Sequence, residues 1–595
     1  MRLRIESERV ALPHNSSEEQ QPLSPASDYA FLDTILEHNG KGEILHDDFT
    51  VLRAPDHDVT SSGLAFFSDQ KIRSLSQKLG NKILKNLVER IEEVIQGRIV
   101  IRDTSSMSAV EFRRPVLSRT LSAKLARTYI ESYFYHLHPV FPFMDRAEFE
   151  KASGLDLANP SASDAAFSAL YHSILALGCQ FHERHNFDPG QGEAWYLFQV
   201  SLGYIPDILA PRESLTGLQA LIAMPQSIFA NTTCCLQVDE MLLMEATRMA
   251  LALRYHRAVG NNEHHYNSAC RRTFWVVYCM EKHMTFQNQR ASMIPDCDIG
   301  CPVPETPEAI FGGFNWFFST ARFSRILSRA YTTLFSISAM THSVQSSRSS
   351  LSKIEEQVEN WRMTVPVEFR PGCPVDLHRL PSLSAKTVIL QTHFAYYALV
   401  IALSRLKLYL NSREPAAQFQ EARCKLLNAA RTVIEMTQYN EVASYTPLFV
   451  PASLPLAALF ILFEFVIRNP THPETHISLS LLDVAAGHFG LLHYTSGGSL
   501  PSSMVAEFAD IARQHVRDSS SSLDHPSGGR SGRELSNAPF VSEGSERSDG
   551  VGFQADPAVS SEYALDLGQG FDTIALPDLD FRTLFGSVLP DLGVD

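Results

Sequence analysis

The stretch "RRTFWVVYCMEKHM", Arg271–Met284, decides the fold class. Its apolar and aromatic residues recur every three or four positions, as they do along one side of a helix with 3.6 residues per turn. One side of that helix is then formed by Arg271, Phe274, Tyr278, Glu281 and Thr285. This spacing predicts a wall that faces a buried core, not a basic surface that touches nucleic acid. We expect Trp275 to lie in the same core, where replacement by alanine costs about 3–5 kcal/mol.

Glu281 is the unusual member of this wall. A carboxylate inside a core needs a cationic or hydrogen-bonding partner, because burying it alone costs several kcal/mol. Two arginines in the surrounding sequence, Arg290 and Arg248, are the candidates for that partner.

Helical spacing continues over most of the chain, and strand-type alternation is scarce. Helical segments are predicted at 214–230, 238–254, 269–289, 316–339, 351–364, 383–409, 417–438 and 455–468, with further helical patterns at 66–98 and 121–200. The predicted fold class is all-α, with a disordered N-terminal arm and an acidic C-terminal tail.

The composition narrows the class of protein. The chain has 595 residues and a net charge of −15, which argues against non-specific coating of phosphate backbones, since that needs clustered Lys and Arg. Nine scattered cysteines favour reduced thiols inside a cell. The densest apolar run, 454–467, contains Glu464 and is shorter than the roughly 20 residues of a membrane span. We therefore expect it to be a buried helix and expect no membrane association.

Composition also marks the domain boundaries. Residues 1–65 are polar and predict a disordered arm, and 66–110 predict a helical lead-in. A large helical domain is predicted over 111–340, with a helical continuation over 341–517. Residues 518–555 are rich in Ser and Gly and predict a linker, followed by an acidic and hydrophobic segment at 556–595.

No pattern predicts catalysis or a metal site. Cys179, His182 and His185 are three residues apart, but a structural zinc site needs four ligands and no second pair lies nearby. The sequence contains no nucleophile elbow, no phosphate-binding loop and no dinucleotide-binding loop. We therefore predict a protein that is not an enzyme, with no catalytic residue, no metal ligand and no cofactor in this chain.

Four segments between Arg127 and Pro304 share the pattern of one protein family. The first, "YIESYFYHLHPVFPFMDRAEF", has an aromatic pair, a His-Pro turn and a Phe-Pro step: Tyr133, Phe134, His138, Pro139, Phe141, Pro142 and Phe149. The prolines are expected to end the helix and bend the chain. The second, "SILALGCQF", ends a helix, with Gly178 as the expected residue just past its end.

The third segment contains "LQAL" with Gln219, followed after a gap by "RYHR" with His256 and Arg257. The fourth is the opening stretch, where the matching residues are Arg271, Arg272, Phe274, Trp275, Glu281 and Arg290. Together the four resemble the fungal-specific transcription factor domain, the middle homology region of fungal zinc-cluster regulators. The family usually has Gly where this chain has Arg254, which puts in doubt the tight helix crossing that we attribute to this Gly.

This resemblance implies a fungal transcription regulator of a metabolic gene set, such as a secondary-metabolite set, located in the nucleus. Its partners are then promoter DNA, coactivators and a homo- or heterodimer partner. An effector molecule between helices stays open, with no residue assigned to it. The family's six-cysteine zinc cluster cannot form within residues 1–178, which contain no cysteine, so zinc is expected only if such a cluster exists elsewhere. Three explanations stay open: a regulator acting through a zinc-cluster partner, a truncated gene model, and a repurposed regulator. The alternative function is a DNA-independent co-regulator or ligand-sensing protein.

The last 40 residues, 556–595, carry eight acids and one base, with aromatic and leucine residues between them. Such a composition is typical of a disordered activation segment, whose acids keep the apolar residues solvated until a coactivator groove binds them on a short helix. The apolar contacts are assigned to Phe571, Leu579, Phe581, Leu584 and Phe585.

Overall fold

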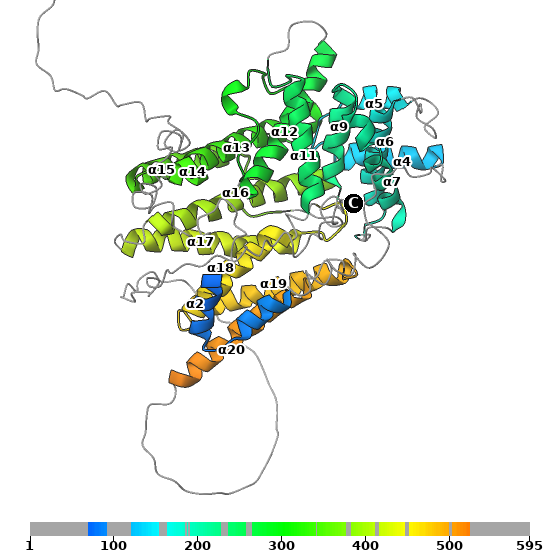
Figure 1. Cartoon of the computed structure of the whole chain (residues 1–595). Coiled ribbons are helices and arrows are strands. Elements are labelled where there is room, and N and C mark those ends of the chain that lie inside the picture. The colour runs from blue at the N-terminus through cyan, green and yellow to red at the C-terminus, as the bar shows by residue number, and fades with distance from the viewer. Residues whose placement is uncertain are drawn as a thin grey trace, which may run out of the picture.

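A computed structural model describes residues 69–91, 121–153, 164–184, 187, 191–227, 236–257, 264–288, 290–340, 342–376, 382–410, 416–446, 452–498 and 502–523 (Figure 1). The predicted arm at 1–65 and the acidic segment at 556–595 lie outside these residues. So do the five residues assigned to activation: Phe571, Leu579, Phe581, Leu584 and Phe585.

The described part is almost entirely helical, which confirms the predicted all-α class. The α-helices are α2 (Asp69–Leu79), α4 (Ala123–His136), α5 (Arg146–Ser153), α6 (Ala165–Gln180), α7 (Gly192–Leu202), α8 (Ile205–Leu209), α9 (Leu215–Ala223), α11 (Leu236–Ala252), α12 (His264–Gln287), α13 (Trp316–Ala330), α14 (Ile337–Met340), α15 (Val344–Thr364), α16 (Leu383–Leu410), α17 (Ala416–Met436), α18 (Leu454–Arg468), α19 (Thr475–Thr495) and α20 (Ala506–Leu523).

Shorter elements join them. Single turns of 3-10 helix are η1 (Met224–Gln226), η2 (Asp296–Asp298), η3 (Pro307–Ala309), η6 (Thr437–Tyr439) and η8 (Ser503–Val505), and a π-helical turn, η4 (Tyr331–Phe335), follows α13. Strands β1 (Ile310–Phe311) and β2 (Phe314–Asn315) form a small antiparallel hairpin, in which Ile310 pairs with Asn315 and Phe311 with Phe314.

Helices that follow one another in sequence pack side by side. Helix α6 packs on α4, α7 and α9, α12 packs between α11 and α13, and α16 to α20 continue the stack (Figure 1). Their inner sides form one continuous apolar core. Helix α2, the first described helix, packs on α18 among the C-terminal helices, where the Arg468 guanidinium donates to Ser74 Oγ at 3.2 Å (Figure 1).

The most apolar helix, α18, and the longest helix, α16, both lie inside this stack. In α18 every residue from Leu454 to Ile467 is buried except Glu464, whose carboxylate accepts from Arg468 Nε at 2.9 Å. This confirms the predicted buried helix. Helix α16 is long and apolar enough to cross a membrane by length and composition, but 72% of its most apolar window is buried inside the protein.

Many helices begin at a residue that caps them. The side chains of Ser122, Asp164, Ser214, Asn315 and Ser343 each accept a hydrogen bond from a backbone N–H in the first turn of the following helix. Such a cap satisfies a donor that has no partner within the helix and contributes about 1 kcal/mol. Two of these caps, Ser214 and Asn315, precede helices whose predicted and observed starts agree to within one residue.

Gly178 has a different role from the predicted one. It lies inside α6 and not just past its end. A Cβ atom at this position would lie 2.0 Å from the carbonyl oxygen of Tyr129 in α4. The glycine is therefore required where α4 and α6 cross, because any side chain would push the two backbones apart.

Arg254 corrects the second expectation about a glycine. Its φ of 59° is the left-handed conformation, just after the end of α11, and the N–H of Tyr255 donates back to the Ala250 carbonyl at 3.2 Å. This is the geometry of a helix end that glycine usually occupies. The glycine that the family has here thus suits a helix end and not a tight helix crossing, and Arg254 takes the same conformation at an energetic cost.

Helices α19 and α20 were absent from the predicted segments. Helix α19 has apolar residues on all sides and two glycines in its second half, so it lacks the one-sided pattern on which the prediction depends. The predicted linker boundary at 518 falls inside α20, which ends at Leu523. Within the helix the hydroxyls of Ser519 and Ser520 donate to backbone carbonyls four residues earlier, at 2.8 and 2.9 Å, so their polar groups are satisfied without breaking the helix.

Candidate functional site

The predicted wall of α12 lies in the core. Phe274 and Glu281 have exposed fractions of 0%, and Tyr278 and Thr285 are also buried, while Arg271 lies at the edge. Trp275 is only partly buried, and its indole Nε1 donates to the Pro302 carbonyl at 3.1 Å. Trp275 therefore packs against the core at its edge, on the rings of Phe274 and Tyr278, and is not fully buried as predicted. The Trp275 side chain lies beside the buried side of α12 and contacts the loop that follows this helix.

Neither predicted arginine contacts Glu281. The Glu281 carboxylate instead accepts from the Met293 N–H at 2.7 Å and from Ser292 Oγ at 2.9 Å. Arg290 pairs with Glu240, and Arg248 pairs with Glu245 and Glu213. The reason lies in the path of the chain, which turns back over α12 directly after the helix and brings its own backbone amide to the carboxylate.

A buried lysine follows Glu281 in the sequence and was not predicted. The Lys282 side chain is 2% exposed, and its Nζ lies 3.9 Å from the Glu281 carboxylate and 3.5 Å from that of Asp296. It also donates to the Ile294 carbonyl at 2.6 Å. Burial lowers the pKa of Lys282, and both carboxylates oppose that shift. Burial likewise raises the pKa of Glu281, and the Lys282 ammonium opposes it.

Asp296 connects this pair to a third helix. Its carboxylate accepts from Tyr278 Oη of α12 at 2.9 Å and pairs with Arg325 of α13. Burial, together with the neighbouring Asp296 carboxylate, raises the pKa of Tyr278 above its usual range. The network thus places two acids and two bases between α12, the following loop and α13, and the charges balance.

The rest of this loop is held by the residues that carry the family resemblance. We call residues 290–309 the strap. Asp298 pairs with His256 at 3.1 Å and with Arg257 at 3.0 Å, and these contacts lower the pKa of Asp298, with the Arg257 hydrogen bond as the largest cause. Arg272 pairs with Glu308 at the other end of the strap. These side chains act as positioning groups for one loop.

The His-Pro turn is the second structural centre. His138 Nε2 lies 2.9 Å from the Met144 carbonyl, and burial lowers the pKa of His138, which this hydrogen bond opposes. The ring of Phe134 contacts those of His138 and Phe149 at centroid distances of 5.0 and 5.6 Å. Tyr133, Pro142 and Phe149 are buried, and Pro139 and Phe141 are partly buried.

All four segments converge on this turn. The Phe143 carbonyl accepts from Thr273 Oγ1 at 2.8 Å and from Gln219 Nε2 at 3.3 Å, which joins the first, third and fourth segments. The second joins through the contact between Gly178 and Tyr129. The shared residues therefore bring four distant parts of the chain into one packed unit.

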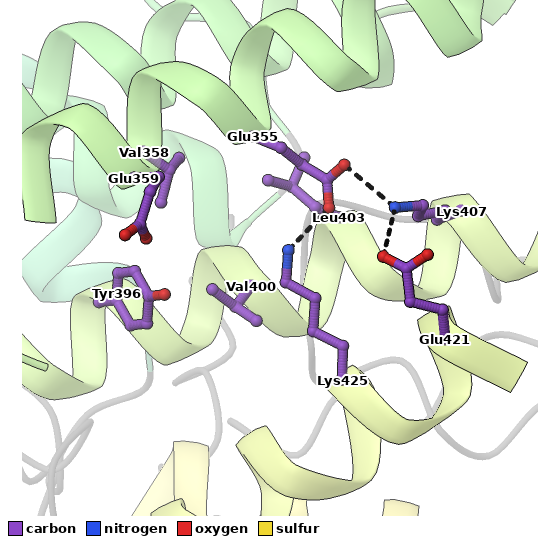
Figure 2. Close-up of a pocket in the computed structure, with 9 residues that line it drawn as sticks. All are labelled: Glu355, Val358, Glu359, Tyr396, Val400, Leu403, Lys407, Glu421 and Lys425. Atoms are coloured by element: carbon purple, nitrogen blue, oxygen red, sulfur yellow. Dashed lines mark hydrogen bonds and ion pairs between the residues drawn. The ribbon is translucent and has the colours of Figure 1, made fainter. Parts of the chain in front are cut away.

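A cavity of about 260 Å³ lies between α15, α16 and α17 (Figure 2). Lys407 Nζ lies 3.3 Å from Glu355 and 3.6 Å from Glu421, and Lys425 Nζ lies 2.8 Å from Glu355. Burial raises the pKa of Tyr396, which also lines the cavity, to about 12. Both lysines are neutralised by glutamates, so the ion pairs connect the three helices and leave no unpaired lysine charge for an anion.

The residues considered for zinc do not come together as a metal site. Cys179 is buried, and His182 Nε2 lies 3.0 Å from Ser132 Oγ. His185 is not among the described residues. Within the described part of the chain, no group of three or more His, Cys, Asp or Glu residues is placed to hold a metal ion. The absence of a cofactor stays a prediction.

Comparison with known proteins identifies the class. Residues 130–363 match the fungal specific transcription factor domain, from α4 to the end of α15. The chain therefore carries this domain, as the four segments predict, and α16 to α20 extend the same core beyond it.

Similar whole proteins are transcription factors of fungi. The chain is 22% identical over 487 residues to an ABC-transporter-regulating transcription factor of Aspergillus fumigatus, which covers 76% of this chain and 54% of that protein. A protein of the same description from Aspergillus oryzae is 22% identical over 499 residues, 78% of this chain and 55% of its own length. The Fusaridione A cluster transcription factor of Fusarium heterosporum is 24% identical over 385 residues, 60% and 70% of the two chains.

The chain spans about half the length of the two Aspergillus proteins. The domain and these relatives belong to transcription regulators and not to enzymes, which supports the prediction that the chain is not an enzyme. Transcription regulation is thus the function class to which this domain and these relatives belong.

Proposed function

We propose that this chain is a nuclear transcription regulator that controls a set of metabolic genes. The single observation that supports this most strongly is the fungal specific transcription factor domain at 130–363. Two relatives carry names that refer to an ABC transporter and to the Fusaridione A cluster. The proposed targets are therefore genes for transport or for a secondary metabolite.

In this proposal the helical domain catalyses no reaction. It binds a partner or ligand and transmits that binding as a change in helix packing. Its shared residues, such as His256, Arg257 and Arg272, bond to the strap and to the core. The strap crosses from α12 to α13, so a partner or ligand that displaced it would loosen both helices at once. This arrangement supports regulation by a change in packing.

The segment at 556–595 is proposed to recruit coactivators. Its support is the composition, eight acids and one base with interspersed Phe and Leu. Fused to an unrelated DNA-binding domain, the segment should activate a reporter gene. The variant with Phe581→Ala and Phe585→Ala should lose most of that output, and an Arg582→Ala variant serves as the control. A fusion without any output contradicts the proposal.

The chromosomal experiment tests the proposal as a whole. The full chain, expressed with an epitope tag in the fungus that encodes it, should occupy promoters of transport or metabolic genes, and deletion should change their transcript levels. Promoter occupancy that disappears when a zinc-cluster partner is deleted would favour the alternative, a co-regulator that acts through that partner. If the chain occupied no promoter and its deletion changed no transcript level, both versions of the proposal would be overturned.

A further inference from the structure

Helix α19 turns an apolar side away from the bundle. Ile477, Val484 and Leu491 follow one another at seven-residue spacing and are 53%, 46% and 53% exposed, and Tyr494 is 84% exposed. Large apolar residues this exposed, in line along one helix, are the pattern of a surface that a second helix covers.

Small residues lie between the large ones. Ser480, Gly487 and Gly490 are exposed on the same side. A Cβ atom on Gly487 or Gly490 would meet no atom of this chain within 4 Å. Glycine inside a helix costs about 1 kcal/mol relative to alanine, and here no packing within the chain requires it. A helix that approaches closely from outside would require it.

The order of large and small residues complements itself. In a seven-residue pattern, Ile477, Val484 and Leu491 occupy one core position and Ser480, Gly487 and Tyr494 the other. In an antiparallel pair these two positions face each other across the two-fold axis. Val484 then faces Gly487 of the second copy, Leu491 faces Ser480, and Ile477 faces Tyr494. A parallel pair would instead place glycine opposite glycine and leave a gap.

The charges on α19 argue against the acidic segment of this chain, residues 556–595, as the partner that covers this apolar side. Residues 475–495 contain no Lys or Arg, so the helix offers no permanent positive charge to the eight acids of residues 556–595. Asp483, beside the apolar stripe, is already paired with Arg513 of α20. The surface is apolar, and the described residues of α19 leave no unpaired acidic side chain beside it, so a second copy of the same surface can cover it without an opposite charge.

We propose that α19 is a homodimerisation surface, on which two copies of this chain pack as antiparallel helices centred between Val484 and Gly487. The contact runs from Ile477 to Tyr494, about 26 Å at 1.5 Å per residue. One helix pair of this length buries less than the roughly 800 Å² per partner of a stable interface. The dimer is therefore weak and forms in a concentration-dependent manner.

Sedimentation velocity of the full chain over a concentration series tests this surface. The wild type should shift from monomer to dimer as concentration rises, and Gly487→Leu should remain monomeric over the same range. The added side chain meets no atom within 4 Å in the monomer, and the control Gly313→Leu, at another glycine with open space, should dimerise like the wild type. A wild type that stays monomeric, or a Gly487→Leu dimer of unchanged strength, overturns the proposal.

Cysteine cross-linking tests the orientation. The exposed Cys297 and Cys424 are first replaced by serine. Under air oxidation, a mixture of Val484→Cys and Gly487→Cys chains should form more cross-linked dimer than either chain alone. Cross-linking that is strongest for Val484→Cys alone would show a parallel pair and refute the antiparallel arrangement. If removing residues 524–595 were needed before any dimer formed, the tail would be the occupant of α19 in the full chain, and the proposal would be wrong.

Discussion

Replacing Glu281 by glutamine should loosen the strap selectively. The carboxylate lies 3.9 Å from Lys282 Nζ, and two unit charges at that distance attract by about 4 kcal/mol at an effective dielectric constant of 20. Glutamine is cheaper to bury than a carboxylate and can still accept from the Met293 N–H, and Asp296 still compensates Lys282. We therefore expect a net loss of about 2 kcal/mol.

Hydrogen exchange measured by mass spectrometry locates this loss. A local change of about 2 kcal/mol corresponds to roughly 30-fold faster exchange of the strap amides, Met293 and Ile294 first, if local opening governs their exchange. The double variant Glu281→Gln with Lys282→Met should cost at least about 1 kcal/mol less than the sum of the two single changes. Glu213→Gln, which breaks an exposed ion pair with Arg248, should leave strap exchange unchanged. Unchanged strap exchange in Glu281→Gln, or strict additivity, would refute this account of the network.

Three further predictions concern the scaffold. Burial lowers the pKa of His393 to about 4, below its usual value of 6.5, so the unfolded chain binds the proton first and stability falls as pH drops from about 6.5 to about 4. His393→Gln should remove up to about 3 kcal/mol of that loss in thermal melts at several pH values, whereas the exposed His476→Gln should not change the pH profile. Arg254→Gly should raise the melting temperature, with a gain of about 1 kcal/mol from relief of the left-handed backbone, and Glu131→Gly at an exposed position in the middle of α4 should lose a similar amount; a loss in Arg254→Gly would contradict the helix-end role. Gly178→Ala should cost about 1–3 kcal/mol because its methyl group collides with the Tyr129 carbonyl, and Gly490→Ala should gain about 1 kcal/mol; equal effects on denaturant midpoints would mean that the α4–α6 crossing does not need glycine.

The predictable part of this structure is its local part. The α12 wall follows from helix periodicity alone, and a run such as 454–467 can only be buried, so both were foreseen. The partner of Glu281 could not be foreseen, because it is a backbone amide and a serine whose position depends on the path of a loop. Sequence reasoning favours charged partners, while the fold supplied Met293 and Ser292.

Two other failures have the same cause. Gly178 and the glycine replaced by Arg254 were each assigned a role from general preferences, yet a glycine serves both helix ends and helix crossings. Only the neighbouring backbone decides between them. Lys282 and Asp296 were missed because a lysine in a helix and an aspartate in a loop are ordinary on the surface. The one available signal was the acid at Glu281 within an apolar run.

The packing of α2 against helices made near the end of the chain has a consequence for synthesis of the protein. Ser74 and Arg468 are 394 residues apart, and Arg90 and Glu507, which also pair, are 417 residues apart. At about 5–20 residues per second, helix α2 leaves the ribosome about 20–80 s before its packing partner exists. During that time its apolar side, with Ile72 and Leu75, has no native surface to bury against. Nascent chains should therefore engage chaperones through this N-terminal helix until α18 has been made.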